Sequence, residues 1–360
     1  MFKQKIPVVL IYGYPLSIRF FGGLIWIKKV AEYLEKSEVF NVRKVSNGKE
    51  SKGRIFPRIL TIRALLQVFF INPKITILDT YGEAAIWIWI LLRLFRPSTK
   101  IVTIFHHYEP FFVQHNKGGK LRRKYCSLLD LLTKMMLKNS DSILTVSNAS
   151  LNQLENILRI RHTQKIVVVG CSNSDHLSVA SYEKRDLDFL CVGRFEKFNG
   201  IENIWNIIKK KNPTSKFVMI GRVSSKDLLR LRDIGIDHRG IVSDENKVEL
   251  YGRARVLLFP SLFEGFGMAI TEALSARLSI VAWKLPVFEE RFEDGKDGTL
   301  NNGELVEIGN HGLFAQKALL ALQGHEKWLE RAPVRVQKFN FTKTWNDVGN
   351  NVLSVLNKIS

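Results

Sequence analysis

The amino-acid sequence predicts an α/β protein built from two doubly wound parallel-sheet domains. Short apolar runs alternate with helical stretches through most of the chain, which is the pattern of parallel strands covered by helices. The alternation is interrupted near the middle by the polar stretch Ser181–Asp186. The length of 360 residues also favours two domains of ordinary size over one.

Five strands are expected in an N-terminal domain that spans residues 1–180. Each is a short apolar run that stops at a turn or a polar residue: Val8–Tyr12, Ile75–Leu78, Ile101–Phe105, Ile143–Val146 and Ile166–Val169. Such runs are typical of strands buried on both faces of a sheet. A turn containing Gly22 and Gly23 precedes a predicted helix over about residues 24–35, and another helix is expected near Tyr125–Lys138.

The alternation restarts after Ser181–Asp186, which we interpret as a linker. Four further strands are expected in a C-terminal domain that spans residues 187–338: Phe189–Val192, Phe217–Ile220, Val256–Phe259 and Ile280–Ala282. Residues 339–360 follow, with the pattern of an amphipathic helix. Two α/β halves of this kind leave a cleft in which a ligand can bind at the carboxyl ends of the strands.

The most informative segment is Phe259–Leu274, which changes from a strand pattern to a helical pattern after Gly267. Gly265 and Gly267 allow the backbone to approach a ligand closely. The following helix directs free N–H groups and a partial positive charge at the turn, so the turn suits an anion. Glu264 and Glu272 would repel a phosphate, but they accept hydrogen bonds from sugar hydroxyls. An ordinary turn with solvated glutamates is the alternative, and the paired carboxylates favour a sugar phosphate.

Glu264 and Glu272 are related as E-x7-E within E-G-F-G-M-A-I-T-E-A-L. This segment resembles the signature of the retaining family 4 glycosyltransferases (glycosyl transferases group 1), which have the GT-B fold. The resemblance implies two Rossmann-like domains that face a cleft, with the C-terminal helix crossing back to the first domain. It implies that Glu272 binds the donor ribose and that Glu264 contacts the transferred sugar. The diphosphate would be held by backbone N–H groups of Gly265, Phe266, Gly267 and Met268, without a metal.

A second segment, Gly193–Gly200, resembles the family's G-R-L-x-x-x-K-G motif. Arg194 and Lys197 would neutralise the diphosphate leaving group. Asn199 stands where the family usually has lysine. Either Lys197 substitutes for that lysine or the second cation is missing, and a charged surface loop is the alternative for both residues.

Two features of the first half resemble the family less specifically. Gly22 and Gly23 match the position of its glycine-rich loop facing the nucleotide diphosphate, although such pairs are usually simple turns. His106 and His107 follow a predicted strand, where the family commonly has T-x-H, and one of them would contact the sugar or orient the acceptor hydroxyl. The segment Thr103-Ile-Phe-His-His has one residue more than that motif. Which histidine faces the site is therefore open, and a packing histidine is the alternative.

The net charge of +20 is concentrated in the first half. Residues 1–180 contain 27 Lys and Arg against 11 Asp and Glu, a net +16, and residues 181–360 contain 27 against 23, a net +4. Within the first half, Lys117–Lys124 has five cations among eight residues and precedes the apolar-rich Tyr125–Leu137. This arrangement predicts docking onto an anionic membrane surface. A solvated loop before a buried helix is the alternative, and nucleic acid is disfavoured because no binding module is recognised.

Several other classes are disfavoured by the sequence. The longest uncharged apolar stretch, Ala84–Leu92, is too short to span a membrane,. The three cysteines are scattered, which indicates a reduced, cytoplasmic protein, peripheral on the inner face of the membrane if it docks there. No zinc spacing or P-loop occurs, and Asp186-Leu-Asp188 opens a strand rather than leaving one. We therefore expect no metal and no cofactor.

These patterns together predict a retaining, metal-independent hexosyltransferase of polysaccharide biosynthesis. It would move a sugar from a UDP- or GDP-type donor to a hydroxyl acceptor, a lipid-linked or cell-surface saccharide at the cytoplasmic membrane face. The alternative is a non-catalytic GT-B-like adaptor that binds anionic membrane or polyanions. Asn199 favours the adaptor, and the intact glutamate pair opposes it.

Overall fold

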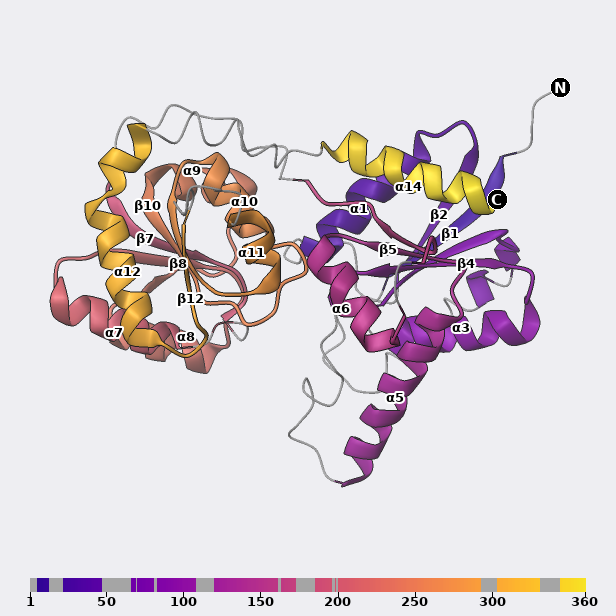
Figure 1. The fold of residues 1–360 in the computed structure, drawn as a ribbon, viewed down its shortest axis with the longest axis horizontal. Helices are drawn as coiled ribbons and strands as arrows, with labels where there is room; N and C mark the ends of the chain where they lie inside the picture. The colour runs from indigo at the N-terminus through magenta and orange to yellow at the C-terminus, as the bar shows by residue number, and fades with distance from the viewer. Residues whose placement is uncertain are drawn as a thin grey trace. The chain divides into compact units, whose positions relative to one another are not determined.

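Each half of the chain folds around a six-stranded parallel sheet (Figure 1). The computed structural model describes residues 5–12, 22–46, 66–68, 70–80, 83–107, 120–160, 163–172, 185–195, 198, 200–292, 303–330 and 344–360. The chain divides into two units, one of Met1–Cys171 with Lys343–Ser360 and one of Ser172–Thr342. The predicted pair of doubly wound parallel sheets is therefore confirmed.

The first unit has the strand order β2-β1-β3-β4-β5-β6, with every neighbouring pair parallel. Its strands are β1 (Ile6–Tyr12), β2 (Phe40–Ser46), β3 (Ile75–Asp79), β4 (Lys100–Phe105), β5 (Ser142–Thr145) and β6 (Ile166–Val168). Its helices with assigned bounds are α1 (Gly22–Glu35), α3 (Glu83–Phe95), α5 (Lys120–Lys138), α6 (Asn148–Leu158) and α14 (Trp345–Ile359). Every strand expected from an apolar run in this half coincides with one of these strands.

Two features of the first unit differ from the sequence expectation. Strand β2 was not predicted because it lies at the edge of the sheet and alternates polar with apolar residues, so no apolar run marks it,. Gly22 and Gly23 lie in the first turn of α1 rather than in a turn before it. Glycine is tolerated there because the first N–H groups of a helix have no partner within the helix.

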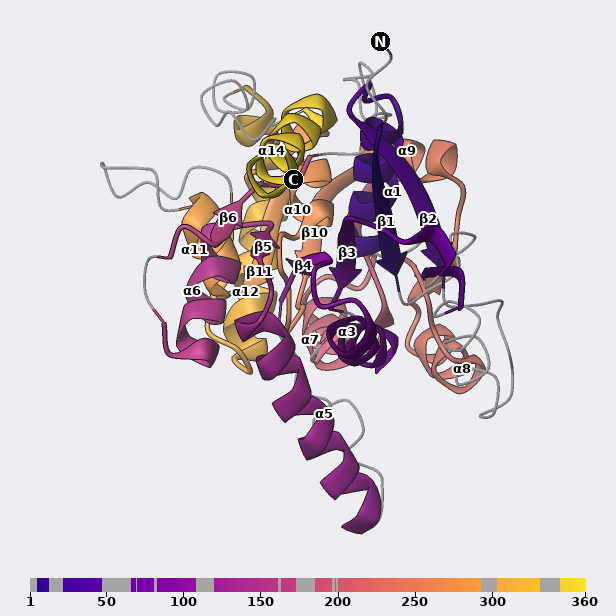
Figure 2. The ribbon, with the colours of Figure 1, turned by 90° about the vertical axis from the view of Figure 1, so that its right-hand side faces the viewer.

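The C-terminal helix α14 belongs to the first unit, where it packs against α1 (Figures 1 and 2). The Tyr33 hydroxyl donates to the side-chain carbonyl of Asn350, and Asn351 Nδ2 donates to the Val169 carbonyl over 3.1 Å. Gly349 faces the Tyr33 ring so closely that a Cβ there would lie 2.3 Å from ring carbons. The last helix of the chain therefore packs on the first unit and belongs to it.

The second unit has the strand order β12-β11-β10-β7-β8-β9, also parallel throughout. Its strands are β7 (Leu187–Val192), β8 (Phe217–Ile220), β9 (Asp237–His238), β10 (Ala254–Phe259), β11 (Ser279–Trp283) and β12 (Glu304–Val306). Its helices with assigned bounds are α7 (Ile201–Lys211), α8 (Ser225–Asp233), α9 (Asp244–Arg253), α10 (Met268–Ser275), α11 (Pro286–Phe292) and α12 (His311–Gln323). The strand order reverses between β7 and β10, and ligands of such sheets bind at the carboxyl ends of the strands flanking this point.

Of the predicted linker Ser181–Asp186, only Arg185 and Asp186 lie within the described residues. The Arg185 side chain is buried and donates to the carbonyl oxygens of Tyr251, Ala254 and Ala276. A buried guanidinium is tolerated where its donors find acceptors. This residue therefore ties the start of β7 to α9, β10 and the end of α10, and it is part of the second unit rather than of a solvated connection.

Candidate active site

The turn between β10 and α10 carries the sequence-predicted glutamate motif. Gly267 precedes the first residue of α10 and adopts a φ of 75°, in the left-handed region that favours glycine,. A Cβ at this position would lie 2.6 Å from Cε1 of Phe288, which is fully buried. The turn therefore requires glycine at position 267 both for its backbone conformation and for its packing. Met268 is the first helical residue, so N–H groups of the first helical turn face the segment Gly265–Gly267,.

Glu264 lies in this turn, partly buried, and is held by a neighbouring serine. Ser261 Oγ donates to Glu264 Oε1 over 2.9 Å, and Ser261 is itself fully buried. The backbone of Ser261 also forms an isolated antiparallel bridge with Phe198. The structure thus joins the segment that follows β7 to the segment that follows β10, as expected at a switch point in strand order.

Arg194 follows β7 and therefore also lies at the carboxyl ends of the strands, where its side chain is partly buried. The adjoining backbone is tightly packed, because a Cβ on Gly221 would lie 1.9 Å from the Gly193 carbonyl oxygen. Lys197 and Asn199 lie outside the described residues. The structure therefore brings Arg194 and the Glu264 turn to one edge of one unit.

Glu272 lies one turn inside α10 and is buried, with 4% of its surface exposed. Lys247 Nζ donates to Glu272 Oε1 over 3.0 Å, and the Tyr251 hydroxyl donates to Oε2 over 2.9 Å. Burial, together with the adjacent Glu272 carboxylate, raises the pKa of Tyr251 well above its usual value, so the hydroxyl stays protonated. Glu272 is therefore not a solvated glutamate, and its two partners on α9 were missed by the sequence analysis.

The predicted residues of the first unit lie at the carboxyl end of its own sheet. His106 follows β4 and is 5% exposed, with its ring edge-on to Trp26 of α1 at 5.7 Å between ring centres. Burial lowers the pKa of His106 to about 3, so this imidazole is neutral at pH 7. His107 is only partly buried. Gly22 and Gly23 lie on α1 about one turn before Trp26. The Trp26 indole N–H donates to the Gly170 carbonyl over 2.8 Å.

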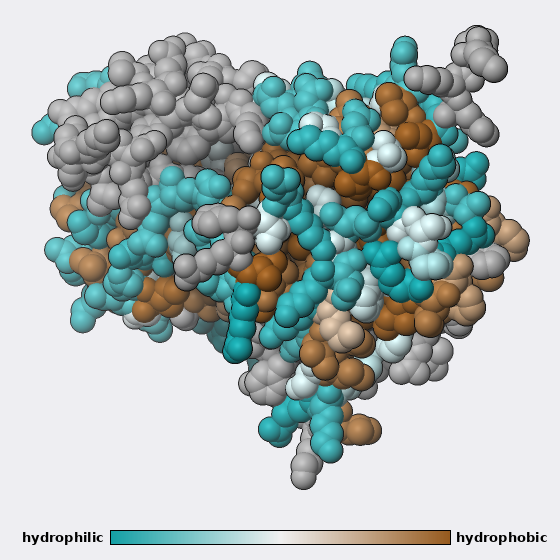
Figure 3. Space-filling view, turned by 45° about the vertical axis from the view of Figure 1, so that its right-hand side comes forward, coloured by the Kyte–Doolittle hydropathy of each residue, from teal (hydrophilic) through white to brown (hydrophobic). Residues whose placement is uncertain are grey.

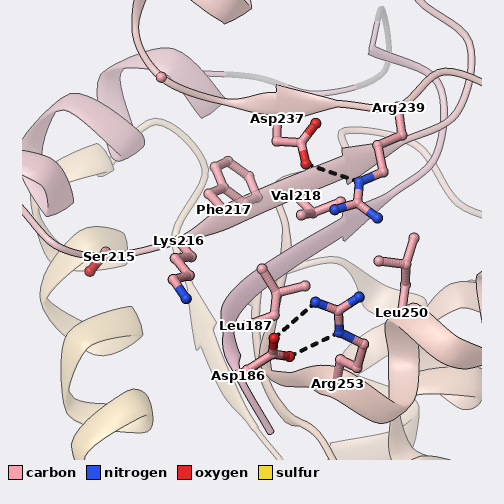
Figure 4. Close-up of a pocket in the computed structure, with 11 residues that line it drawn as sticks. Asp186, Leu187, Ser215, Lys216, Phe217, Val218, Asp237, Arg239, Leu250 and Arg253 are labelled. Atoms are coloured by element: carbon pink, nitrogen blue, oxygen red, sulfur yellow. Dashed lines mark hydrogen bonds and ion pairs between the residues drawn. The ribbon is translucent and has the colours of Figure 1, made fainter.

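A pocket of about 300 Å³ lies at the amino ends of β7, β8 and β9, at the opposite end of these strands from the Glu264 turn (Figure 4). Asp186 pairs with Arg253, with both N–O distances 2.9 Å, and Asp237 pairs with Arg239 across the same pocket. The second acid of the D-x-D sequence, Asp188, pairs with Arg255 at 2.7 Å. These carboxylates are thus engaged by arginines, away from the Glu264 turn.

The described residues contain no group of three or more His, Cys, Asp or Glu side chains that could hold a metal ion.

Comparisons with known proteins show which family and which fold the chain resembles. Residues 159–332 match the family model described as Glycosyl transferases group 1. The chain is similar to the O-antigen chain mannosyltransferase RfbU of Salmonella typhimurium, with 24% identity over 337 residues, covering 88% of this chain and 84% of that protein.

Two solved structures resemble the whole chain. Sucrose-phosphate synthase of Thermosynechococcus elongatus has a TM-score of 0.76 at 14% identity and covers 99% of both chains. HepE of Anabaena, solved in complex with UDP, has a TM-score of 0.69 at 14% identity and covers 99% of this chain and 100% of that one. Both agree with this chain in fold along its whole length. Residues 159–332 thus match the group 1 glycosyltransferases, and the chain has the GT-B fold.

Proposed function

We propose that the chain transfers a sugar, with retention of configuration and without a metal, from a UDP- or GDP-type donor to a hydroxyl acceptor. The observation that carries this proposal is the Glu264–Glu272 turn, which lies at the switch point of the second sheet and at the start of α10. Free N–H groups at a helix start stabilise the charge that develops on a leaving diphosphate. The transfer breaks the bond from the anomeric carbon to the diphosphate oxygen and forms one to the acceptor oxygen, whose proton passes to the departing diphosphate.

The second unit binds the donor. Glu272 accepts hydrogen bonds from the ribose hydroxyls, and Glu264 contacts the transferred sugar. The N–H groups of Gly265, Phe266, Gly267 and Met268 hold the diphosphate together with Arg194, and we retain Lys197 as the second cation. The bridge between Phe198 and Ser261 supports a common site for these segments, since it joins their backbones.

We assign Gly22 and Gly23 to the diphosphate on the family resemblance. Of the two histidines, we assign His107 to the sugar or the acceptor hydroxyl, because its side chain is only partly buried. His106 has a packing role in this proposal, because its buried ring contacts Trp26.

A calorimetric panel tests the donor assignment. UDP, GDP, ADP and TDP are titrated into the wild-type protein and into Glu272→Ala and Glu264→Gln. We expect one nucleotide to bind, Glu272→Ala to weaken it by about tenfold or more, and Glu264→Gln to leave it nearly unchanged while abolishing transfer. The mannosyltransferase name of one relative puts a mannose donor first among the sugars to try. Absence of binding by every nucleotide would refute the donor site.

The acceptor assignment rests on α5 of the first unit. Cys126, Leu129, Thr133 and Met136 form its buried face, while a second stripe at helical spacing is both apolar and exposed. That α5 stripe consists of Leu121, Leu128, Leu131 and Met135, which are 84%, 46%, 55% and 43% exposed. Figure 3 shows hydrophobic and hydrophilic side chains together where α5 projects. Exposed apolar side chains at this spacing are typical of a helix that lies against another surface.

The positive charge beside the α5 stripe favours an anionic membrane as its partner. The helix begins at Lys120, so the predicted basic run enters its first turns, where positive charge opposes the helix dipole,. Arg123, Lys124 and Lys138 are exposed beside the stripe. Pairing with a second copy of α5 would bring cations together, whereas anionic lipid complements them. A lipid-linked saccharide at the cytoplasmic membrane face is therefore the acceptor class we propose. No helix among the described residues is long and apolar enough to cross a bilayer.

Vesicle co-sedimentation tests the docking. We expect binding to vesicles of phosphatidylglycerol and phosphatidylcholine, weaker binding at high salt, and little binding to phosphatidylcholine alone. The double variant Leu128→Glu/Leu131→Glu should lose binding. The matched control, Leu229→Glu/Leu320→Glu, changes two leucines of the second unit that are 63% and 53% exposed and should bind like the wild type. Equal loss in both variants, or equal binding to neutral vesicles, would contradict the docking surface.

A further inference from the structure

The Glu272 carboxylate receives one protein donor on each of its oxygens. Lys247 and Tyr251 supply these donors and are four residues apart on α9, so they lie on the same face of that helix,. Tyr251 is fully buried, and the side chains of Lys247 and Glu272 are 15% and 5% exposed. Asp244 lies 3.7 Å from the same Lys247 ammonium on the more exposed side.

The two donors differ in what they give the carboxylate. Lys247 supplies a counter-charge, which offsets part of the cost of burying a carboxylate. Tyr251 supplies a fixed direction, because its fully buried ring holds the hydroxyl 2.9 Å from Glu272 Oε2. A carboxylate offers about four acceptor positions. Two are taken by the protein donors, which leaves one on each oxygen.

We propose that Lys247 and Tyr251 are positioning residues that fix the Glu272 carboxylate so that its two remaining acceptor positions fit the 2′- and 3′-hydroxyls of a ribose. The inference rests on the proposed donor site. It assigns the discrimination between ribonucleotides and deoxyribonucleotides to a contact between α9 and α10. A cis-diol presents two adjacent O–H donors, one for each oxygen, and a 2′-deoxyribose leaves one acceptor position unfilled.

A purely structural role for the same contacts has a different consequence. If Lys247 and Tyr251 only stabilised the packing of α9 on α10, their loss would weaken ribonucleotide and deoxyribonucleotide binding alike. If they position Glu272, their loss must reduce the preference for the ribose form. The ratio of two dissociation constants therefore separates the two roles, and unfolding affects that ratio little because both ligands bind the same folded fraction.

The experiment compares UDP with 2′-deoxy-UDP, and GDP with 2′-deoxy-GDP, by calorimetry on the full chain. The variants are Tyr251→Phe, Lys247→Met and the conservative Lys247→Arg, with circular dichroism as a check of folding. Asp244→Asn is the matched control on α9, because Asp244 approaches Lys247 and not Glu272. We expect the wild type to prefer the ribose form about tenfold, and Tyr251→Phe and Lys247→Met to lower that preference several-fold. Lys247→Arg should retain part of it, and Asp244→Asn should retain all of it.

The outcomes separate this inference from the proposed function. An unchanged preference in Tyr251→Phe and Lys247→Met, alongside wild-type nucleotide binding that Glu272→Ala weakens, overturns the positioning role and leaves the donor site intact. Equal weakening of both ligand forms likewise assigns the pair a structural role only. A wild type that binds none of the four nucleotides refutes the donor site and the inference together.

Discussion

Replacement of Gly267 by alanine should destabilise the second unit more than an ordinary glycine substitution. The change has two costs that the structure separates. Placing a Cβ at a φ of 75° costs about 1–2 kcal/mol for an L residue,. The new Cβ would also lie 2.6 Å from Phe288 Cε1, and overpacking of a buried site costs about 1–3 kcal/mol. The expected loss in free energy of unfolding is therefore about 2–5 kcal/mol.

Gly309→Ala is the matched control, because Gly309 has a φ of 90° but no atom within 4 Å of a Cβ built there. We expect it to cost only the conformational part, about 1–2 kcal/mol. Urea unfolding of both variants, followed by circular dichroism, measures the difference. A double variant with Phe288→Leu should recover part of the loss in Gly267→Ala, since the contact is relieved. Equal costs for Gly267→Ala and Gly309→Ala would refute the packing argument.

Two further predictions concern stability. Gly349→Ala should lower the free energy of unfolding by about 1–3 kcal/mol, because its Cβ would meet the Tyr33 ring at 2.3 Å,, whereas Gly312→Ala in the first turn of α12 should be neutral or slightly stabilising in the same urea titration. Burial lowers the pKa of His325 from 6.5 to about 3, so its contribution to stability is complete above pH 6.5 and is lost as the pH falls towards 3, at up to about 1.4 kcal/mol per pH unit. His325→Gln should flatten the acid branch of a stability-versus-pH curve by that amount, and an unaltered slope would contradict the burial.

The strands were predictable where burial is uniform. A strand such as Val256–Phe259 within β10 is covered on both faces and appears in the sequence as an apolar run,. Strand β2 lies at the edge of its sheet and mixes polar with apolar residues, while β9 and β12 are only two and three residues long. None of these three strands offers the apolar run by which the others were predicted.

The candidate site likewise contains residues that the sequence pattern could predict and residues that it could not. Glu264 and Glu272 were predictable because their spacing is local and both belong to one turn and helix. Lys247 and Tyr251 were not predictable, because they lie in the polar stretch Asp244–Arg253. Nothing in the sequence distinguishes them there from the other polar residues as partners of Glu272. Only the packing of α9 against α10 selects these two side chains, and packing of this kind is set by tertiary structure rather than by spacing.

The two glutamates of the motif occupy unlike environments, and this difference bears on what each can recognise. Glu264 lies in a turn, is partly buried and has a serine hydroxyl on one oxygen. Glu272 lies inside a helix, is largely buried and is held on both oxygens by an ammonium and a phenol. A fixed carboxylate suits a group that is the same in every donor, such as ribose, because little reorganisation is then needed on binding. Glu264 lies in a turn and is only partly buried, which suits contact with a sugar whose hydroxyl pattern varies. Sugar specificity should therefore depend on the surroundings of Glu264, while the α9–α10 contact governs recognition of the ribose.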